Sequence, residues 1–578
     1  MNDPAPTDPS LPDPALSDPA LPDPALPDPA LADPALADPS PPDASMPDAS
    51  MPDGSTPGGA LAGRLVRAAR PQMVGKVERI GQSEADVIGL QVGPGDLVQV
   101  GDGELDGSLG LGPGGPTAAA AGAPVLAEVV AADGCRATVL PYGDFRGHRV
   151  GEPVEHLAGQ MEVPIGPQLL GRVLDGLANP LDDGPPLSRV DAVGIHNTPP
   201  PALSRPPVVE PMPVGVRAID TLLTCGRGQR IAILAGSGVG KSSLLSMLVR
   251  GSDADVNVLC LVGERGREVR SFLDDDLGPE GLARSVVVVA TSDQPALVRR
   301  NAAYAATRIA EHFRDQGCQV NLLMDSVTRF AVAQREIGLA AGEIPTSRGF
   351  PPSALGLLPG LLERAGTSST GSITGFYTVL VEGDDLNDPV GDTVRSIADG
   401  HIVLSRELAN AGHFPSIDVL ASASRVALAV TNPAQQALAG EVRRLLSVHE
   451  RARDLIEVGA YAPGNDAGLD RAVALAPAIE QFRRQGLHEP APVDETWAVL
   501  DSILRADLTL GGTAPDGAGA AAAPAPGAPV GGAPHGGEAG GFGAPAGGGL
   551  PASGALGLAN RAGAVAEATV AAMAGGGR

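Results

Sequence analysis

The sequence is poor in aromatic residues and in positive charge. Aromatic side chains make up only 2% of its 578 residues, with a single tryptophan. The 41 lysines and arginines are outnumbered by 68 aspartates and glutamates, which gives a net charge of −27. Proteins that bind nucleic acid usually carry a basic stripe with aromatic stacking platforms. The composition therefore argues against a general nucleic-acid binder, and we expect no nucleic-acid partner.

Cysteines and long apolar runs are also scarce. Cys135, Cys225, Cys260 and Cys318 are scattered, without a close pair or the spacing of metal ligands. Each lies in or near an apolar stretch, which is typical of reduced, mostly buried thiols in a cytoplasmic protein. No apolar run reaches the roughly 18 residues that a membrane-spanning helix needs. Any work at a membrane therefore requires a partner that is already there.

Both ends of the chain have a biased composition. From Asp3 to Asp53 an aspartate recurs at every fifth position, and no lysine or arginine precedes Arg64. The dense prolines block helix formation and the evenly spaced charges oppose collapse, so residues 1–57 are predicted to be a disordered Asp-Pro-Ala repeat tail. A signal peptide is excluded, since the positive start and apolar core are missing. Residues 511–578, dominated by glycine, alanine and proline, are predicted to be a second flexible tail.

Between the tails the pattern of apolar residues changes twice. Residues 58–160 hold short β-rich runs broken by glycine, which predicts a small N-terminal β-barrel domain. Residues 161–432 alternate strands with helices, as a mostly parallel sheet covered on both faces requires. Residues 433–510 have apolar side chains at helical spacing and are predicted to form a small α-helical domain. The fold class is therefore α/β, with a central domain flanked by a barrel and a helical domain.

A glycine-rich loop in the central domain predicts a nucleotide site. It lies between a short apolar strand, residues 230–234, and an apolar helix predicted over residues 241–251, with Gly251 as its cap. The glycines let the loop curl so that successive backbone N–H groups point at phosphate oxygens. This strand-loop-helix context favours a P-loop over a chance glycine-rich turn. The residues expected to contact the nucleotide are Ala235, Gly236, Ser237, Gly238, Val239, Gly240, Lys241, Ser242 and Ser243.

The last residues of the loop carry distinct roles. Lys241 is expected to place its ammonium on the β- and γ-phosphates of ATP. The hydroxyl of Ser242 is expected to ligate Mg²⁺, which removes the charge repulsion that resists attack on the terminal phosphate. The implied cofactor is Mg-ATP, and the implied reaction is its hydrolysis.

Two carboxylates stand at the ends of apolar strands, where ligands sit in open α/β sheets. Glu264 follows the run 258–262 and is the candidate general base, which would orient and deprotonate the attacking water. The alternative is a loop glutamate paired with a neighbouring arginine. Asp325 follows the run 320–324 and is the candidate Mg²⁺-binding acid, acting through the water shell of the metal. The alternative is an N-cap of the next helix.

Three arginines are candidates for contact with the phosphates. Arg265 could hold the γ-phosphate or brace Glu264. Arg329 lies about one helical turn beyond Asp325 and could point back toward the phosphates. Arg425 stands in a run of small and apolar residues, where a guanidinium must find an anion or reach water. It is either a solvated turn residue or an arginine finger that completes the site of a neighbouring subunit.

Long segments of the core resemble the hexameric ATPases of type III protein export, and most of all the flagellum-specific ATPase, a family related to the catalytic subunit of rotary ATP synthases. Besides the P-loop, the segments that carry the resemblance are Leu169–Gly176, Gly215–Asp220, Gly226–Arg230, Gly263–Arg270, Asp325–Phe330, Pro351–Ser353, Gly371–Thr374, Val381–Asp385, His401–Arg406 and Val458–Tyr461. The resemblance implies a RecA-like P-loop ATPase domain, preceded by the barrel and followed by the helical domain. It also implies a homohexamer with sites between subunits.

The resemblance places five residues on known roles of the family. These are the P-loop lysine, the magnesium serine, the catalytic glutamate, the Walker B aspartate and the arginine finger, which fall on Lys241, Ser242, Glu264, Asp325 and Arg425. Base and finger lie in one chain, so identical subunits can complete each other's sites. In the rotary synthases the finger comes from a different, non-catalytic chain.

Partners and location follow from the resemblance alone. The implied partners are a stator-like regulatory protein, a coiled-coil stalk protein, export substrates with their chaperones, and the membrane export gate. The implied location is cytoplasmic, peripheral to the inner face of the cell membrane. Flagellar members commonly begin with an amphipathic segment that docks the regulator. This chain begins with the repeat, so docking through its start requires a shortened version near residues 61–69.

The implied function is the ATPase of the flagellar export apparatus, which drives unfolding, chaperone release and export of flagellar proteins. The injectisome ATPase of virulence systems is the nearer alternative, because motifs barely separate the two. A rotary ATP synthase catalytic subunit is disfavoured by the same-chain Arg425. An RNA translocase is disfavoured by the acidic core, and a non-enzymatic nucleotide-binding scaffold by the presence of Lys241, Glu264 and Asp325 together.

Overall fold

The computed structural model describes most of the chain between its two predicted tails. The described residues are 74–103, 105, 122–157, 159–187, 190–381 and 388–510, with only the backbone for 507–510. The predicted tails, residues 1–57 and 511–578, lie outside them, as does the segment 61–69. Among the described residues, no helix is both long and apolar enough to cross a membrane.

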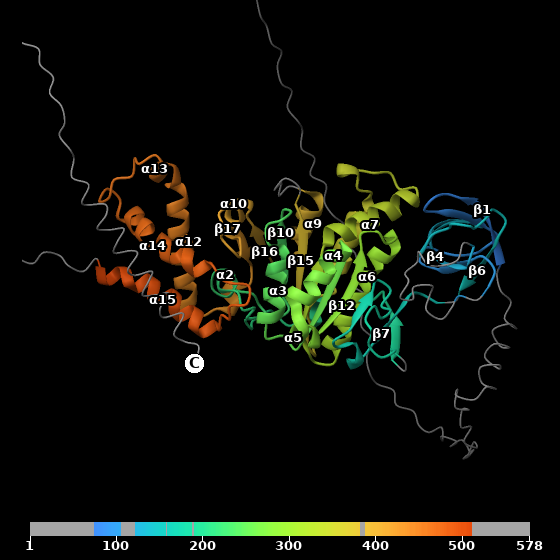
Figure 1. Cartoon of the computed structure of the whole chain (residues 1–578), viewed down its shortest axis with the longest axis horizontal. Coiled ribbons are helices and arrows are strands. Elements are labelled where there is room, and N and C mark those ends of the chain that lie inside the picture. The colour runs from blue at the N-terminus through green and yellow to red at the C-terminus, as the bar shows by residue number, and fades with distance from the viewer. Residues whose placement is uncertain are drawn as a thin grey trace, which may run out of the picture. The chain divides into compact units, whose positions relative to one another are not determined.

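The N-terminal part is a closed antiparallel barrel, drawn in blue in Figure 1. Its strands, in the order β1-β2-β5-β4-β3-β6 around the barrel, are β1 (Val74–Ile80), β2 (Ala85–Ile88), β3 (Leu97–Val100), β4 (Val125–Asp133), β5 (Arg136–Pro141) and β6 (Pro153–Leu157). Valines at alternate positions of the strands fill the interior, among them the fully buried Val87, Val98 and Val139. This arrangement is the barrel that the sequence predicts.

The central part is built on a nine-stranded sheet of described residues, in the order β17-β16-β10-β15-β13-β11-β12-β8 with β14 paired to β15. The strands are β8 (Val173–Asp175), β10 (Arg230–Ala235), β11 (Val256–Glu264), β12 (Ser285–Thr291), β13 (Gln319–Asp325), β14 (Gly366–Thr367), β15 (Ser372–Leu380), β16 (Gly400–Leu404) and β17 (Ile417–Ser424). Only β14 and β17 pair antiparallel to their neighbours within it. A separate antiparallel pair joins β7 (Glu162–Ile165) to β9 (Asp191–Gly194).

Helices cover both faces of this sheet and form the C-terminal part (Figure 1). They are α2 (Arg217–Leu222), α3 (Lys241–Gly251), α4 (Gly266–Ser271), α5 (Gly278–Ala283), α6 (Ala296–Asp315), α7 (Val327–Ala340), α8 (Pro352–Leu362), α9 (Pro389–Ile397), α10 (Arg406–Asn410), α11 (Ala427–Val430), α12 (Pro433–Arg451), α13 (Arg453–Glu457), α14 (Ala467–Arg483) and α15 (Val493–Leu510). Short 3-10 turns are η1 (Pro167–Leu169), η2 (Ala202–Ser204) and η4 (Ser347–Gly349), and η3 (Phe272–Leu277) is a short π-helix that follows α4.

Alternate residues of the buried strands serve two different cores. In β11, Val258 and Cys260 pack in the core that holds α6, α7, α8 and α9. Leu259 and Leu261 face the other core, which holds α2 and α3 and continues into α12, α14 and α15. A strand buried on both faces reads as a continuous apolar run, as these strands do. The observed architecture confirms the predicted α/β class, with a barrel before the central domain and helices after it.

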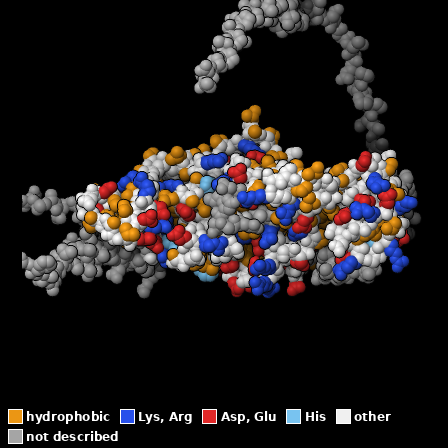
Figure 2. All heavy atoms as spheres, turned by 90° about the horizontal axis from the view of Figure 1, so that it is seen from above, with side chains coloured by type: hydrophobic (Ala, Val, Ile, Leu, Met, Phe, Trp, Pro, Cys, Tyr) orange, Lys and Arg blue, Asp and Glu red, His pale blue; other side chains and the backbone are white. Residues whose placement is uncertain are grey.

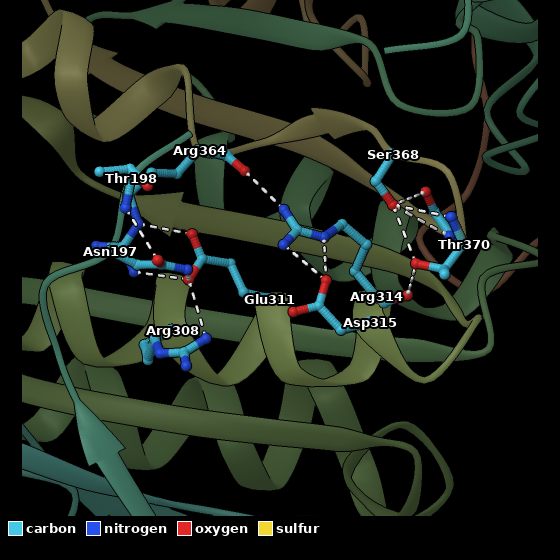
Figure 3. A network of polar contacts seen from close by, with 10 residues as sticks. Asn197, Thr198, Arg308, Glu311, Arg314, Asp315, Arg364, Ser368 and Thr370 are labelled. Atoms are coloured by element: carbon cyan, nitrogen blue, oxygen red, sulfur yellow. Dashed lines mark hydrogen bonds and ion pairs between the residues drawn. The ribbon is translucent and has the colours of Figure 1, made fainter. Parts of the chain in front are cut away.

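A buried ionic cluster fixes α6 against the chain segments around it. Glu311 on α6 is fully buried and accepts hydrogen bonds from Arg364 at 2.7 and 3.0 Å. Figure 3 shows Asn197 and Arg308 also reaching the Glu311 carboxylate, at 2.8 and 3.3 Å. A buried carboxylate is tolerated only when its lone pairs are satisfied in this way. The cluster therefore connects three parts of the central domain: the segment that follows β9, helix α6, and the residues that follow α8.

The glycine at the end of α3 has a different role from the predicted cap. Gly251 is the last helical residue, and Ser252 is the C-cap. A Cβ at position 251 would lie 2.6 Å from the carbonyl oxygen of Val214 and 2.8 Å from the Cα of Gly215. The predicted cap is wrong, because glycine is needed here for close approach of two backbones and not for a left-handed turn.

Asp220 on α2 is a buried acid near the same backbone contact. It is 2% exposed, and its Oδ1 accepts a hydrogen bond from the Val214 N–H at 2.9 Å. Its Oδ2 has no hydrogen-bond partner among the described residues. Burial raises the pKa of Asp220 to about 7 from the ordinary 3.8. The folded chain thus holds a proton there that the unfolded chain has already released near neutral pH.

Replacing Asp220 with asparagine should remove a pH dependence of stability. Because the native pKa is raised, the stability associated with this group is present at low pH and is lost as the pH rises through about 7. The wild-type chain should therefore lose more stability than Asp220→Asn between about pH 5 and about pH 8 in urea unfolding. Asp392→Asn, an exposed acid on α9, serves as the control. Parallel pH profiles of wild type and Asp220→Asn would contradict the assignment.

Candidate functional site

The glycine-rich loop joins the C-terminal end of β10 to the first residue of α3. Gly238 and Gly240 have φ of 77° and 94°, a left-handed region that favours glycine. Gly240 is the N-cap of α3, and no described side chain caps that end with a hydrogen bond. The first N–H groups of the helix, at its positive dipole end, therefore have no hydrogen-bond partner among the described residues. This geometry is suited to binding an anion such as a phosphate.

Three charged residues of the sequence prediction meet at the mouth of this loop. The Nζ of Lys241 lies 2.5 Å from Asp325 Oδ1 and 3.2 Å from Glu264 Oε1. The side chain of Lys241 is 12% exposed, that of Asp325 is 5% exposed and that of Glu264 is 18% exposed, so all three are largely withdrawn from water. Strands β11 and β13 are hydrogen-bonded neighbours, with Leu261 level with Asp325, which brings the two acids to one edge. One ammonium between two carboxylates leaves a net negative charge.

The electrostatics of this cluster favour an ionised lysine and a more basic glutamate. Burial opposes the Lys241 ammonium, but attraction to Asp325 and Glu264 outweighs it and raises the pKa of Lys241. Burial, joined by repulsion from Asp325, raises the pKa of Glu264 above its ordinary value despite the nearby Lys241. A carboxylate with a raised pKa is a better proton acceptor, as a general base requires.

The sequence left open that Asp325 is an N-cap and that Glu264 pairs with a neighbouring arginine, and the contacts of both acids test these alternatives. Ser326, not Asp325, caps α7 by accepting a hydrogen bond from the Arg329 N–H. Asp325 instead accepts a hydrogen bond from the Thr378 hydroxyl at 2.7 Å. Glu264 pairs with Lys241 and not with the adjacent arginine. The roles of base and metal ligand themselves stay predictions.

The two arginines next to these acids differ in their surroundings. Arg265 is 68% exposed and donates to Glu268 at 2.8 Å, so in this conformation it does not brace Glu264. The side chain of Arg329 lies against Gly263, where a Cβ would come within 2.9 Å of it. Its positive charge also favours the ionised form of Glu264. Arg329 is therefore near the cluster, and Arg265 reaches it only by changing rotamer.

Arg425 lies at the opposite edge of the sheet from its own P-loop. Strand β16 runs parallel to β10, with Leu404 level with Ala235 where the loop begins. Strand β17 returns antiparallel, so that Ser424 is level with Gly400 at the other end of β16. Four residues of extended strand separate the two edges, which is about 13 Å. In the same chain Arg425 instead donates to the Arg395 carbonyl at 3.4 Å.

Several residues that touch the site were not predicted. Thr378 reaches Asp325 from β15, the strand between β10 and β13. Arg406 and Ser416 donate to backbone carbonyls of the P-loop. Arg406 ends the segment His401–Arg406 that carries the family resemblance, whereas no local motif marks Thr378 or Ser416, which reach the site only through the folded sheet. Strand β15 places Thr378 at the same carboxyl edge of the sheet as Asp325.

The donor set at the loop fits a hard cation with a nucleotide. The hydroxyl of Ser242 is exposed at the start of α3, and the Asp325 carboxylate lies at the adjoining strand end. Oxygen donors of this kind suit Mg²⁺, which is usually held by one or two carboxylates together with phosphates. The net negative charge of Lys241, Glu264 and Asp325 together also favours binding of a cation. Ser242 and Asp325 are accordingly the residues that would hold the ion.

Charge on the surface is mixed in sign. On the face drawn in Figure 2, lysine and arginine side chains lie interspersed with aspartate and glutamate. This pattern on that face differs from the single-sign basic stripe of nucleic-acid-binding proteins. The absence of a nucleic-acid partner stays a prediction.

Comparisons with known proteins extend from the P-loop to the C-terminal helices. Residues 215–424 match the ATP synthase alpha/beta family, nucleotide-binding domain. Residues 431–502 match the T3SS EscN ATPase C-terminal domain. These two matches cover the P-loop, Glu264, Asp325 and Arg329 together with α12, α13 and α14, and Arg425 lies between the two matched ranges.

Similar proteins come from two kinds of export system. The flagellum-specific ATP synthase of Bacillus subtilis is 51% identical over 379 residues, covering 66% of this chain and 86% of that protein. The SPI-2 type 3 secretion system ATPase of Salmonella typhimurium is 51% identical over 364 residues, covering 63% and 84%. The structure of the assembled ATPase EscN in complex with its central stalk EscO, from the enteropathogenic E. coli type III secretion system, matches with a TM-score of 0.66 and 41% identity. It covers 74% of this chain and all of that chain.

Proposed function

The chain belongs to the family of flagellum-specific and type III secretion ATPases and hydrolyses ATP, and on that premise we propose that it powers protein export by the flagellum. The observation that carries the proposed site is the meeting of Lys241, Glu264 and Asp325 beside an uncapped helix start. A lysine, a carboxylate base and a second acid at one P-loop are the parts that hydrolysis of a phosphoanhydride needs.

In the proposed mechanism ATP replaces the internal partners of Lys241. The phosphates bind the ammonium of Lys241 and the N–H groups at the start of α3, which no described side chain caps. Ser242 and Asp325 would hold Mg²⁺, which would supply positive charge to neutralise the phosphates. Glu264, released from Lys241, accepts a hydrogen bond from a water and takes its proton as the water oxygen bonds to the γ-phosphorus. The bond from the γ-phosphorus to the bridging oxygen breaks, so that ADP leaves with that oxygen and inorganic phosphate is formed. Arg329 stabilises the ionised form of Glu264 from its other side.

Arg425 acts in trans in this proposal. Its own P-loop is at the far edge of the sheet, so a phosphate contact has to be made in another subunit. A guanidinium that reaches the γ-phosphate of a neighbour stabilises charge in the transition state. We therefore propose a homohexamer of identical chains, in line with the assembled state of EscN. Each chain then supplies the base to one site and the finger to the next.

Partners are proposed from the relatives. EscN is seen with its central stalk EscO, and we propose a coiled-coil stalk protein for this chain as well. A stator-like regulator, export substrates with their chaperones and the membrane export gate complete the proposed set. The chain would work in the cytoplasm, at the inner face of the cell membrane, through these partners. We propose that the chain uses ATP to unfold flagellar proteins and to release them from their chaperones.

The flagellar system is proposed ahead of the injectisome. The flagellum-specific relative aligns over 379 residues and the SPI-2 relative over 364, at the same 51% identity. A type 3 secretion system ATPase of Xanthomonas euvesicatoria aligns over 443 residues at 45% identity, so neither identity nor alignment length separates the two systems. The flagellar assignment rests on the resemblance of the sequence motifs, and the injectisome is the second candidate. Deleting the gene tests the choice directly. Loss of motility with unchanged effector secretion supports the flagellar role, and the reverse result supports the injectisome.

The specific ATPase activity of the purified chain should rise with protein concentration. A site that is completed between subunits gains activity as the ring assembles. The measurement is phosphate release across a range of protein concentrations, with light scattering to follow assembly and with RNA added to a parallel series. Activity that is independent of assembly would contradict the inter-subunit site. Stimulation by RNA would favour a translocase over an export ATPase.

A further inference from the structure

The segment around α10 holds the P-loop from its outer side. The guanidinium of Arg406 donates a hydrogen bond to the Ser237 carbonyl at 3.0 Å. The hydroxyl of Ser416 donates to the Val239 carbonyl at 2.6 Å. These two carbonyls belong to the loop residues that precede Gly238 and Gly240. Two polar side chains thus bind alternate peptide groups of the loop.

The position of Ser416 is itself fixed. The residue is 1% exposed, and its own carbonyl accepts a hydrogen bond from the Ser405 N–H at 2.8 Å, beyond the end of β16. The neighbouring Phe414 ring lies 3.5 Å from where a Cβ of Gly240 would be. A buried hydroxyl held on the sheet has little freedom, so it sets the position of the carbonyl that it binds.

The hydrogen bonds to the Ser237 and Val239 carbonyls also determine where the next N–H groups, those of Gly238 and Gly240, point. In a trans peptide the C=O and the following N–H point in opposite directions. The cis peptide bonds of the described residues do not include any in the loop. With the Val239 carbonyl turned outward to Ser416, the Gly240 N–H is turned to the inner side of the loop. The bond from Arg406 to Ser237 does the same for the Gly238 N–H.

We propose that Ser416 is a positioning residue of the ATP site, which aims the Gly240 N–H at the phosphates by holding the Val239 carbonyl. Arg406 assists by holding the peptide before Gly238. The inference rests on the proposed nucleotide site at the P-loop. It adds to that site a residue from a distant segment that never touches the nucleotide. Without Ser416 the Val239 carbonyl loses its buried partner, and this peptide plane is free to rotate.

The test is the variant Ser416→Ala in the full-length chain. We expect the Kd for Mg-ADP, measured with a fluorescent ADP analogue, to rise about tenfold, since losing one buried hydrogen bond has about this effect. The KM for ATP should rise in parallel, while kcat at saturating ATP changes by less than about twofold, because the contact serves ground state and transition state alike.

A matched control separates this role from general stability. Ser422 is a serine of equal burial, 1% exposed, on the adjoining strand β17. Its hydroxyl bonds the Asp418 carbonyl and the Val403 N–H, away from the P-loop. Ser422→Ala should keep the Kd for Mg-ADP of the wild type. Thermal unfolding of both variants checks that they are folded.

The outcomes separate failure of this inference from failure of the proposed site. An unchanged Kd in Ser416→Ala, or an equal rise in Ser422→Ala, overturns the positioning role. If Lys241→Ala loses ADP binding at the same time, the nucleotide site itself stands. If Lys241→Ala binds ADP as the wild type does, the proposed site fails, and the positioning role fails with it.

Discussion

Replacing Glu264 with glutamine should lower ATP turnover by at least about 100-fold, the usual contribution of a general base. Binding of Mg-ADP should change little, because Lys241, Asp325 and the P-loop, which are expected to hold the phosphates and Mg²⁺, are unchanged in this variant. Glutamine has the size of glutamate but cannot accept the proton of the attacking water. The variant should therefore bind nucleotide and fail to hydrolyse it.

The measurement is phosphate release in the assembled enzyme beside the Kd for Mg-ADP. Glu268→Gln is the matched control, because Glu268 lies four residues further on and forms an exposed pair with Arg265. Exposed ion pairs contribute little, so this variant should remain active. Full activity of Glu264→Gln would remove Glu264 from the role of base. If Glu264→Gln loses both hydrolysis and ADP binding, the main role of Glu264 is to position Lys241.

Replacing Arg425 with alanine should lower the turnover rate by about 1000-fold, the lower range known for arginine fingers. The reason is that the guanidinium would be missing from the γ-phosphate of the neighbouring subunit during transfer. Nucleotide affinity should remain, since the P-loop and its acids lie at the other edge of the sheet. Arg395→Ala, which replaces a partly buried arginine on α9 beside Arg425, is the control and should stay active.

Mixing the two inactive variants distinguishes a finger in trans from a residue that acts in its own chain. In a mixed ring, an Arg425→Ala chain supplies Glu264, and a Glu264→Gln chain beside it supplies Arg425. With random assortment at equal amounts, about a quarter of the interfaces hold both groups, so about a quarter of the wild-type rate should return. If mixing restores nothing although the chains co-assemble, the two residues do not share a site between subunits.

The sequence contained enough to place the main chemistry. Glu264 and Asp325 each end an apolar run, and strands of one parallel sheet bring such ends to the same edge. The P-loop was equally clear, because its pattern is local. The fold class could be predicted because the spacing of apolar residues changes along the chain, from short β-rich runs to alternating strands and helices and then to helical spacing. These features depend on residues that are near one another in sequence, or on one general rule of α/β topology.

Other parts depended on packing that no local pattern reveals. Ser416 reaches Val239 across 177 positions of the chain, and only the folded sheet brings them together. Strand β17 ends in Ala-Ser-Ala-Ser, residues with weak strand preference, so its edge position comes from pairing with β16. Gly251 was predicted as a cap, although its lack of a side chain serves close contact with Val214. Each of these misses is a case of tertiary structure deciding what propensity could not.

The placement of Arg425 and the P-loop at opposite edges of one sheet gives each subunit a polarity. In the proposed assembly Arg425 completes the site of a neighbour, so copies of the chain would join head to tail, with the edge that holds Arg425 against the edge of the next chain that holds the P-loop. Head-to-tail growth either continues as a filament or closes on itself. The subunit that closes the ring forms two contacts while losing its freedom of motion only once. Complete rings are then favoured over partial ones, and a single defective surface would stop growth at that point.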